Sequence, residues 1–359
     1  MHIATAPFTA AQTRFADDFL NREGSRYLYG RTKEAESIAR LIKVDGFIDD
    51  YTSDASFMGL PCIRLADLPA DARVISTIVQ ARPISALRKL EQKNCSHLDF
   101  FAFHRLSGLP FREIPYWAGA KAHFIANRPD YTALHAALAD AESRETMEHV
   151  LRFRLNHDLR EMAGFVLNQK TMYIEPFLRL PGNGAVFFDL GAYDGYNSRQ
   201  FLETYPDGST AVLFEPIPQQ AAALTANAAN DARLSVFSLA VSDFDGPVSF
   251  SIDDTASTIS KDGSGIACEA IRLDTFCARY QRVPDYIKMD IEGSELKALA
   301  GATQTIARHR PNLAISVYHD ASHLTQAYKI VSEICPNYKF FLRHYTEGYT
   351  ETVLFAVPA

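Results

Sequence analysis

Long apolar runs, paired cysteines and an excess of positive charge are all missing from this chain of 359 residues. Because no run of about 18 apolar residues occurs, we expect no transmembrane helix and no membrane partner. The five cysteines are far apart and form no Cys-x-x-Cys pair, which argues against a zinc site and a disulfide framework. The N-terminus lacks the pattern of a secretory signal, so we expect a cytoplasmic protein with free thiols. The net charge of −7 provides no basic surface for nucleic acid, and a small or neutral substrate is favoured.

The two common phosphate-binding fingerprints are missing as well. The most prominent glycine turn, 191–195, reads Gly-Ala-Tyr-Asp-Gly and matches neither GxGxxG nor GxxxxGK[ST]. The missing lysine excludes a P-loop, and the missing third glycine disfavours a dinucleotide-dependent oxidoreductase. A ligand at this turn is therefore expected to lack a pyrophosphate.

Strand patterns that alternate with helix patterns are what the chain does contain, and they predict two α/β domains. We expect an N-terminal helical segment over 1–24, a small Rossmann-like domain over 25–105, a helical connector over 106–180 and a second α/β domain over 181–359. The first of the two domains is expected to contain a strand over 98–104.

The second domain shows seven strand patterns. The last two are joined by residues 346–351, TEGYTE, which leave no room for a helix. Parallel neighbours need a longer crossover, so these strands predict an antiparallel hairpin at the end of a parallel sheet. The expected strands are 186–191, 210–216, 234–242, 285–292, 312–319, 339–345 and 352–358.

The first of these strands leads into the glycine turn. Its residues are apolar apart from Asp189, and a buried carboxylate is costly unless it is hydrogen-bonded or faces a polar ligand. Glycine permits a tight turn and a close approach of ligand to backbone, and ligands of such sheets bind outside the carboxyl ends of the strands. The helix that begins near Asn197 or Ser198 offers free amide groups at the same edge. An ordinary strand-to-helix turn is the alternative interpretation.

A second acidic residue, Glu215, ends the next strand and precedes Pro216. It lies 26 residues after Asp189, close to the spacing at which an acidic residue binds ribose hydroxyls. Since the pyrophosphate turn is missing, this arrangement favours an adenosine ligand without a diphosphate; a surface acid at a strand end is the alternative. The segment Leu239–Asp243, LAVSD, ends the third strand, where an adenine ring is expected.

Carboxylates also follow the fourth strand. Strand periodicity puts Lys288, Asp290 and Glu292 on one face, with the two acids near the carboxyl edge of the sheet. These acids could orient a substrate, take a hydroxyl proton or hold a divalent metal, although Glu292 could instead cap the next helix. His319 ends the fifth strand and is a candidate base, with a structural role equally open. We assign no metal, and Asp290 with Glu292 is the most credible pair for one.

These segments, taken in order, resemble the FkbM family of S-adenosylmethionine-dependent methyltransferases. The resemblance covers 171–358, and its strongest pieces are FDLGAYDG, FEP, LAVSD, YIKMDIEGSELKALAGA and ISVYH. It implies an α/β fold of the class I methyltransferase type, with a seven-stranded sheet, and S-adenosyl-L-methionine as cofactor. It also implies O-methylation of a hydroxyl on a sugar, a glycan or a related natural product.

The residues of the expected site fall into two groups. We place Asp290, Glu292 and His319 on the substrate side as catalytic candidates, without choosing a single base. Cofactor contacts are expected at Asp189, Gly191, Ala192, Tyr193, Asp194, Gly195, Ser198, Glu215, Pro216, Ser242 and Asp290.

Two other functions stay open at this point. A scaffold could bind the cofactor or a nucleotide sugar without catalysis. A nucleic-acid methyltransferase is less favoured, because amino-methylating enzymes of that kind often carry [DN]PP[YFW] after the fourth strand, where this chain has DIEG.

The N-terminal domain is similar to the Rossmann-like domain at the front of sugar N-acyltransferases, through YLYG, VDGFIDD and PCIRLADLP. It departs from that pattern at 30–33, where Gly-Arg-Thr-Lys replaces a glycine-rich loop. We therefore expect it to dock a substrate or to form a homodimer. Two acidic pairs have functional alternatives: Asp49–Asp50 could touch a ligand, and Asp253–Asp254 could resemble a glycosyltransferase pair. We expect a turn at the first pair and a strand followed by a turn at the second, within SFSIDDTAS.

Overall fold

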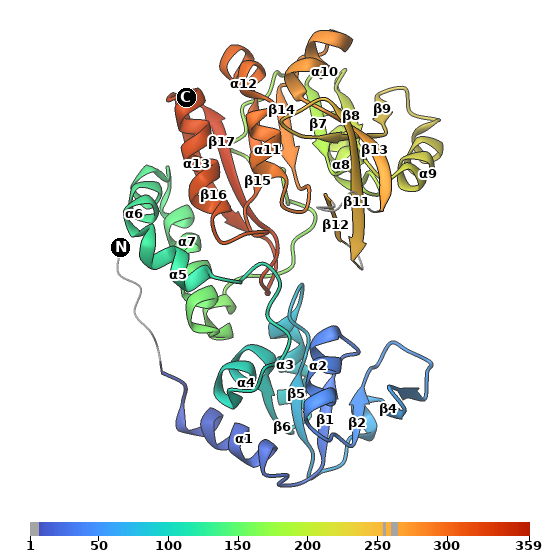
Figure 1. The fold of residues 1–359 in the computed structure, drawn as a ribbon, viewed down its shortest axis with the longest axis vertical. Helices are drawn as coiled ribbons and strands as arrows, with labels where there is room; N and C mark the ends of the chain where they lie inside the picture. Colours follow the sequence, from blue (N-terminus) through green and yellow to red (C-terminus); the bar gives the residue numbers. More distant parts are fainter. Residues whose placement is uncertain (1–6, 254–255, 260–264) are drawn as a thin grey trace. The chain divides into compact units, whose positions relative to one another are not determined.

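The computed structural model describes residues 7–253, 256–259 and 265–359 and divides into two compact units (Figure 1). The first unit comprises the chain up to Ala122, Glu145–Asn168 and Tyr345–Thr350. The second comprises His123–Arg144, Gln169–His344 and Glu351–Ala359. Each unit is therefore assembled from separate stretches of the chain.

A six-stranded sheet with the order β3-β4-β2-β1-β5-β6 forms the centre of the first unit. All neighbours are parallel except β3 and β4, as expected for strands that alternate with helices. The strands are β1 Arg26–Tyr29, β2 Gly46–Ile48, β3 Ser56–Phe57, β4 Leu60–Ile63, β5 Arg73–Ser76 and β6 Ser96–Asp99. The helices before residue 108 are α1 Ala10–Leu20, α2 Lys33–Leu41, η1 Leu65–Asp67, α3 Pro83–Gln92 and α4 Phe100–Ser107.

The strand predicted over 98–104 is wrong beyond Asp99, where β6 ends and α4 begins. The Asp99 carboxylate accepts a hydrogen bond from the backbone amide of Ala102 at 2.9 Å, which caps the helix. Phe100, Phe101 and Phe103 are all completely buried. A continuous apolar run of this kind has no periodicity that separates a buried helix from a buried strand.

The stretch 106–180 is mainly helical, as predicted, and its residues are divided between the two units. Its helices are α5 Ala120–Ala126, α6 Arg128–Ala137, α7 Ala141–Asn156 and η2 Leu159–Met162. Among the helices of the described stretches, none combines the length and apolarity needed to cross a bilayer.

A seven-stranded sheet with the order β16-β17-β15-β14-β7-β8-β9 forms the centre of the second unit (Figure 1). Five neighbouring strands of this sheet are parallel, namely β9, β8, β7, β14 and β15. β17 is antiparallel to both β15 and β16, which confirms the predicted hairpin. The strands are β7 Val186–Leu190, β8 Thr210–Phe214, β9 Leu234–Phe237, β14 Tyr286–Met289, β15 Asn312–Ser316, β16 Tyr338–His344 and β17 Thr352–Pro358. The helices from residue 196 onward are α8 Tyr196–Thr204, α9 Pro218–Ala228, α10 Leu273–Tyr280, α11 Glu295–Ala300, α12 Thr303–His309 and α13 His323–Ile334.

A smaller sheet with the order β10-β13-β11-β12 accompanies it. The sequence predicted a strand within SFSIDDTAS, where β11 lies, but not the sheet. The strand predicted over 234–242 splits, because β10 Leu239–Val241 leaves the large sheet and pairs with β13 Ile266–Ile271. The other two strands are β11 Gly246–Asp253 and β12 Ala256–Ile259. Of the acidic pair in this region, Asp253 ends β11, and Asp254 lies outside the described residues.

The loop between β16 and β17, residues 345–350, is part of the first unit. The backbone amide of Glu347 donates to the carbonyl oxygen of Ala81 at 3.1 Å. Gly348 lets the loop lie close to the backbone of Val79 and Gln80, because a Cβ at this position would overlap the carbonyl of Gln80. The loop leads directly into β17.

We expect Gly348→Ala to lower the free energy of unfolding by about 2–4 kcal/mol, since the added methyl group fits only if backbone moves. Urea unfolding followed by circular dichroism measures this change. Gly164→Ala is the matched control, because a Cβ there meets nothing within 4 Å. Equal, small changes in both variants would contradict the close contact.

Candidate functional site

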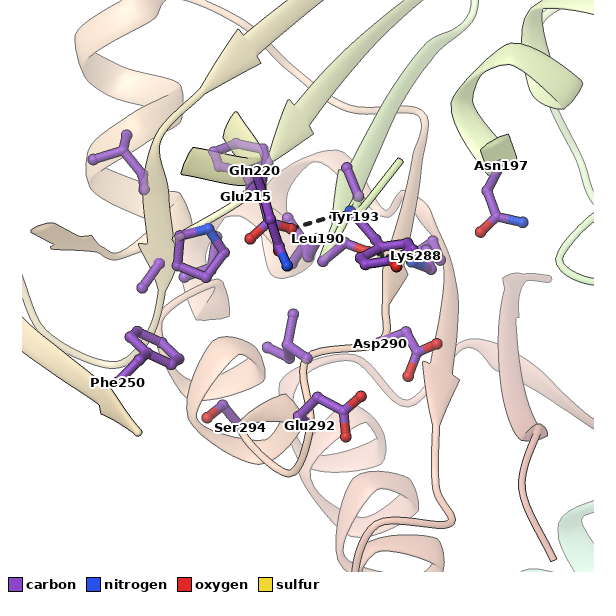
Figure 2. A pocket seen from close by; sticks show the side chains of 18 of the residues that line it. Leu190, Tyr193, Asn197, Glu215, Gln220, Phe250, Lys288, Asp290, Glu292 and Ser294 are labelled. Atoms are coloured by element: carbon purple, nitrogen blue, oxygen red, sulfur yellow. Dashed lines mark hydrogen bonds between the residues drawn. The ribbon is translucent and has the colours of Figure 1, made fainter. Parts of the chain in front are cut away.

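A cavity of about 410 Å³ lies at the carboxyl ends of β7, β8 and β14 in the second unit (Figure 2). The turns after these strands bring eight of the predicted site residues to its wall: Gly191, Ala192, Tyr193, Asp194, Glu215, Pro216, Asp290 and Glu292. The other predicted residues lie outside the lining: Asp189, Gly195, Ser198, Ser242 and His319.

The sequence analysis missed part of the wall. Phe250 comes from β11 of the unpredicted small sheet, and Glu351 directly precedes β17. Tyr318 also lines the cavity, one residue before His319. A tyrosine at the end of a strand already marked by a candidate base could have been noticed, whereas Phe250 and Glu351 belong to no motif.

The glycine turn holds a left-handed backbone. Gly191 and Gly195 have φ values of +78° and +75°, and Tyr193 between them has +49°. A Cβ on Gly191 would overlap the backbone carbonyl of Asp290. Glycine is therefore required at this point for β7 and β14 to lie close enough to share one cavity.

Asp189 lies beneath the turn, completely buried, and forms an ion pair with Lys288 at 3.0 Å. Ser198 on α8 donates to the same carboxylate at 2.7 Å, and Lys288 Nζ donates to the carbonyl oxygen of Gly191 at 2.9 Å. Burial alone lowers the pKa of Lys288, but Asp189 and then Asp290 outweigh it and raise that pKa above its usual value. The strand acid is thus satisfied within the protein and supports the turn from below.

Glu215 is 4% exposed and lies on the cavity wall at the end of β8. Its Oε2 accepts a hydrogen bond from the backbone amide of Tyr193 at 3.1 Å (Figure 2). Its Oε1 accepts one from the backbone amide of Ile217 at 3.0 Å. Burial raises the pKa of Glu215, while these two amides act in the opposite direction. The carboxylate is therefore held in one orientation at the cavity.

The segment LAVSD divides between wall and interior. Leu239, Ala240 and Val241 line the cavity and offer an apolar surface at the end of the third strand region. Ser242 is completely buried, and its hydroxyl donates to Asp243 at 3.1 Å. An adenine ring predicted here would therefore meet the first three residues.

Asp290, after β14, accepts two tyrosine hydroxyls. Tyr173 donates to Oδ2 at 3.0 Å, and Tyr318 donates to Oδ1 at 3.2 Å. Burial and the charge of Asp290 raise the pKa of both tyrosines well above its usual value, so both are neutral donors. Tyr173 lies in an irregular stretch before β7, where no sequence pattern marked it.

His319 lies behind these carboxylates, with its side chain fully buried. Its Nε2 is 3.6 Å from Asp290 Oδ1 and 3.4 Å from Glu292 Oε2, and its Nδ1 is 2.9 Å from Glu295 Oε1. Burial lowers the pKa of His319, but Glu295, Asp290 and Glu292 together raise it to about 9. At neutral pH it is a buried cation among three carboxylates.

Glu295, the first residue of α11, completes this cluster and was not predicted. It accepts the backbone amides of Ile291 at 2.9 Å and Gly293 at 3.4 Å, and its Oε2 is 3.3 Å from His323 Nδ1. Although burial raises the pKa of Glu295, His319 and His323 hold it far below the usual range. Glu295 therefore joins the DIEG turn to His319. Glu292, predicted as an alternative helix cap, lies on the cavity wall instead.

The buried His319 cation makes stability depend on pH. Because its pKa rises from 6.5 to about 9 on folding, its contribution is fully present below pH 6.5 and is lost as the pH rises through about 9. The shift corresponds to at most about 3 kcal/mol. We expect the free energy of unfolding to fall over this interval and the fall to be smaller in His319→Asn. Urea unfolding at several pH values tests this, and parallel curves for the two proteins would rule it out.

The chain is similar to known methyltransferases in structure and in sequence. A crystal structure of methyltransferase FkbM from Methylobacillus flagellatus KT superimposes with a TM-score of 0.73 at 23% identity, covering 97% of this chain and 94% of that one. This likeness confirms the α/β fold over nearly the whole chain.

Sequence similarity to known proteins covers part of the chain. The 2-O-methyltransferase NoeI of Sinorhizobium fredii is 30% identical over 35% of this chain, which spans 60% of that relative's length. The family described as the methyltransferase FkbM domain matches residues 189–344, from the buried acid of β7 to the end of β16. The stretch that matches this family model carries nearly all of the residues that line the cavity.

Proposed function

We propose that the second unit transfers the methyl group of S-adenosyl-L-methionine to a hydroxyl of a sugar, a glycan or a related natural product. The observation that carries the proposal is the fixed Glu215 carboxylate on a cavity beside a glycine turn that lacks a pyrophosphate fingerprint. The name of NoeI describes a 2-O-methyltransferase, which supports a hydroxyl as the methyl acceptor.

The residues of the cavity fit this cofactor. Glu215 can accept hydrogen bonds from both hydroxyls of a ribose, since its backbone partners fix its orientation. Leu239 and Val241 offer apolar surface for an adenine ring. Gly191 leaves room for close approach, because its lack of a side chain keeps the turn open.

When bound, S-adenosyl-L-methionine supplies a methyl group on a positively charged sulfur. The chain's part in the reaction is to align an acceptor hydroxyl with that group and to receive its proton. Asp290 and Glu292 lie on the cavity wall and are the proton acceptors that we propose. His319 does not line the cavity, so its proposed role is to position these two carboxylates from behind.

We expect Glu215→Ala to raise the dissociation constant of S-adenosylhomocysteine about 10- to 100-fold, because the ribose loses a charged hydrogen-bond acceptor. Isothermal titration calorimetry measures the change. Glu203→Ala, an exposed acid on α8, is the control and should bind as the wild type does. Unchanged affinity in Glu215→Ala would exclude this pocket assignment.

We propose that the transfer needs no metal ion. Asp290, Glu295 and His319 each offer one ligand atom, and these atoms lie within 4.8 Å of one another. However, Glu295 is engaged with backbone amides and two histidines, and Asp290 with two tyrosines. We therefore expect turnover to survive EDTA, measured as formation of S-adenosylhomocysteine. A loss that added Mg²⁺ or Mn²⁺ restores would contradict this expectation.

A further inference from the structure

Glu351 lines the cavity but has no role in the proposed methyl transfer. It lies on the wall of the same cavity as Asp290 and Glu292, at the point where the chain enters β17. Its backbone has a φ of +64°, a left-handed conformation that is costly for a residue with a side chain. The hairpin therefore holds this side chain at the cavity at some cost in backbone strain.

The Glu351 carboxyl group has an unused oxygen. Its Oε2 is shielded from solvent and has no hydrogen-bond partner among the described residues. A buried polar atom without a partner is destabilising, and a catalytic role is one of the reasons for which proteins keep such an atom. The oxygen therefore indicates a missing partner in the cavity.

Charged groups surround this carboxyl group from three elements. Burial, Asp290 and Glu292 raise the pKa of Glu351, whereas His319 and Lys288 lower it, and the result is about 8. The neutral Tyr173 and Tyr318 hydroxyls also interact with it electrostatically. At neutral pH Glu351 is therefore mostly protonated and can donate a hydrogen bond, which a carboxylate cannot do.

We propose that Glu351 is a further catalytic residue that donates a hydrogen bond to the acceptor, and that the acceptor carries two vicinal hydroxyls. This inference rests on the proposed methyl transfer. Asp290 already accepts two tyrosine hydroxyls and offers only acceptor atoms, whereas the neighbouring Glu351 offers a donor. Two adjacent hydroxyls match this pair, since one gives its proton to Asp290 and the oxygen of the other receives the proton of Glu351.

The transfer moves one methyl group and one proton. The reacting hydroxyl loses its proton to Asp290 as its oxygen forms the bond to the methyl carbon. The sulfur–methyl bond breaks, and its electron pair stays on the sulfur, which becomes a neutral thioether. Glu351 keeps its proton throughout and orients the second hydroxyl.

An infrared experiment tests the protonation without any acceptor. At pH 7 the wild-type protein should show the carbonyl stretch of a protonated carboxyl group, and Glu351→Gln should lose that intensity in the difference spectrum. Glu203→Gln on the exposed face of α8 should retain it. An unchanged band in Glu351→Gln would overturn the assignment of Glu351 while leaving the proposed function intact.

Kinetics with a panel of methyl hexopyranosides and their deoxy analogues test the contact. Glu351→Ala should lower kcat/KM about 10- to 100-fold for a diol acceptor, with unchanged affinity for S-adenosylhomocysteine. This factor corresponds to about 1.4–2.8 kcal/mol, in the range of one hydrogen bond. The wild type should lose a similar factor when the hydroxyl next to the methylated one is missing, and Glu351→Ala should lose no further activity. Equal losses on removing that hydroxyl in both proteins would overturn the proposal.

The pH profile separates this role from a purely structural one. Because the protonated form is the active one, wild-type kcat/KM should fall as the pH rises through about 8. Glu351→Gln keeps a donor that cannot ionise, so it should retain most activity at pH 7 and lack this fall. A Glu351→Gln variant as inactive as Glu351→Ala would contradict the donor role. A wild type that methylates no member of a broad hydroxyl panel would instead count against the proposed function.

Discussion

The buried ion pair between Asp189 and Lys288 is the interaction on which the cavity depends. It joins neighbouring strands, β7 and β14, and Lys288 also holds the carbonyl of Gly191 at the start of the turn. Removing either partner would leave an uncompensated charge in the interior, which is far more costly than never having had the pair. Two acids of the cavity wall, Glu215 and Asp290, follow β8 and β14, the strands on either side of β7.

A second group of charged side chains lies behind Asp290 and Glu292. Glu295 ties the backbone of the DIEG turn to His319, and His319 in turn lies between Asp290 and Glu292. The histidine thus places a positive charge beside two carboxylates of the cavity wall without lining the cavity itself.

The sequence predicted the large sheet and the position of the glycine turn well, because both depend on local patterns. Glycines at 191 and 195, and Glu215 at a strand end, are visible as residue types at fixed spacings. The rest of the cavity was harder, since Phe250 and Glu351 line it, and Tyr173 supports Asp290, from stretches far apart in the chain. Their positions follow from tertiary packing and from the small sheet, neither of which has a short-range signal. The helix after Asp99 was missed for a related reason, as a fully buried run shows no amphipathic period.

The loop of residues 345–350 has a consequence for how this protein can vary. The two units alternate along the chain, so no single peptide bond separates them. Recombination at one junction that replaced the N-terminal domain would remove the residues that this loop contacts, such as Ala81. A replacement front unit would have to accommodate the same loop, or the loop would have to change with it. Glu351, on the cavity wall, follows this loop directly. A change in the first unit that altered the loop would therefore also affect a residue of the cavity.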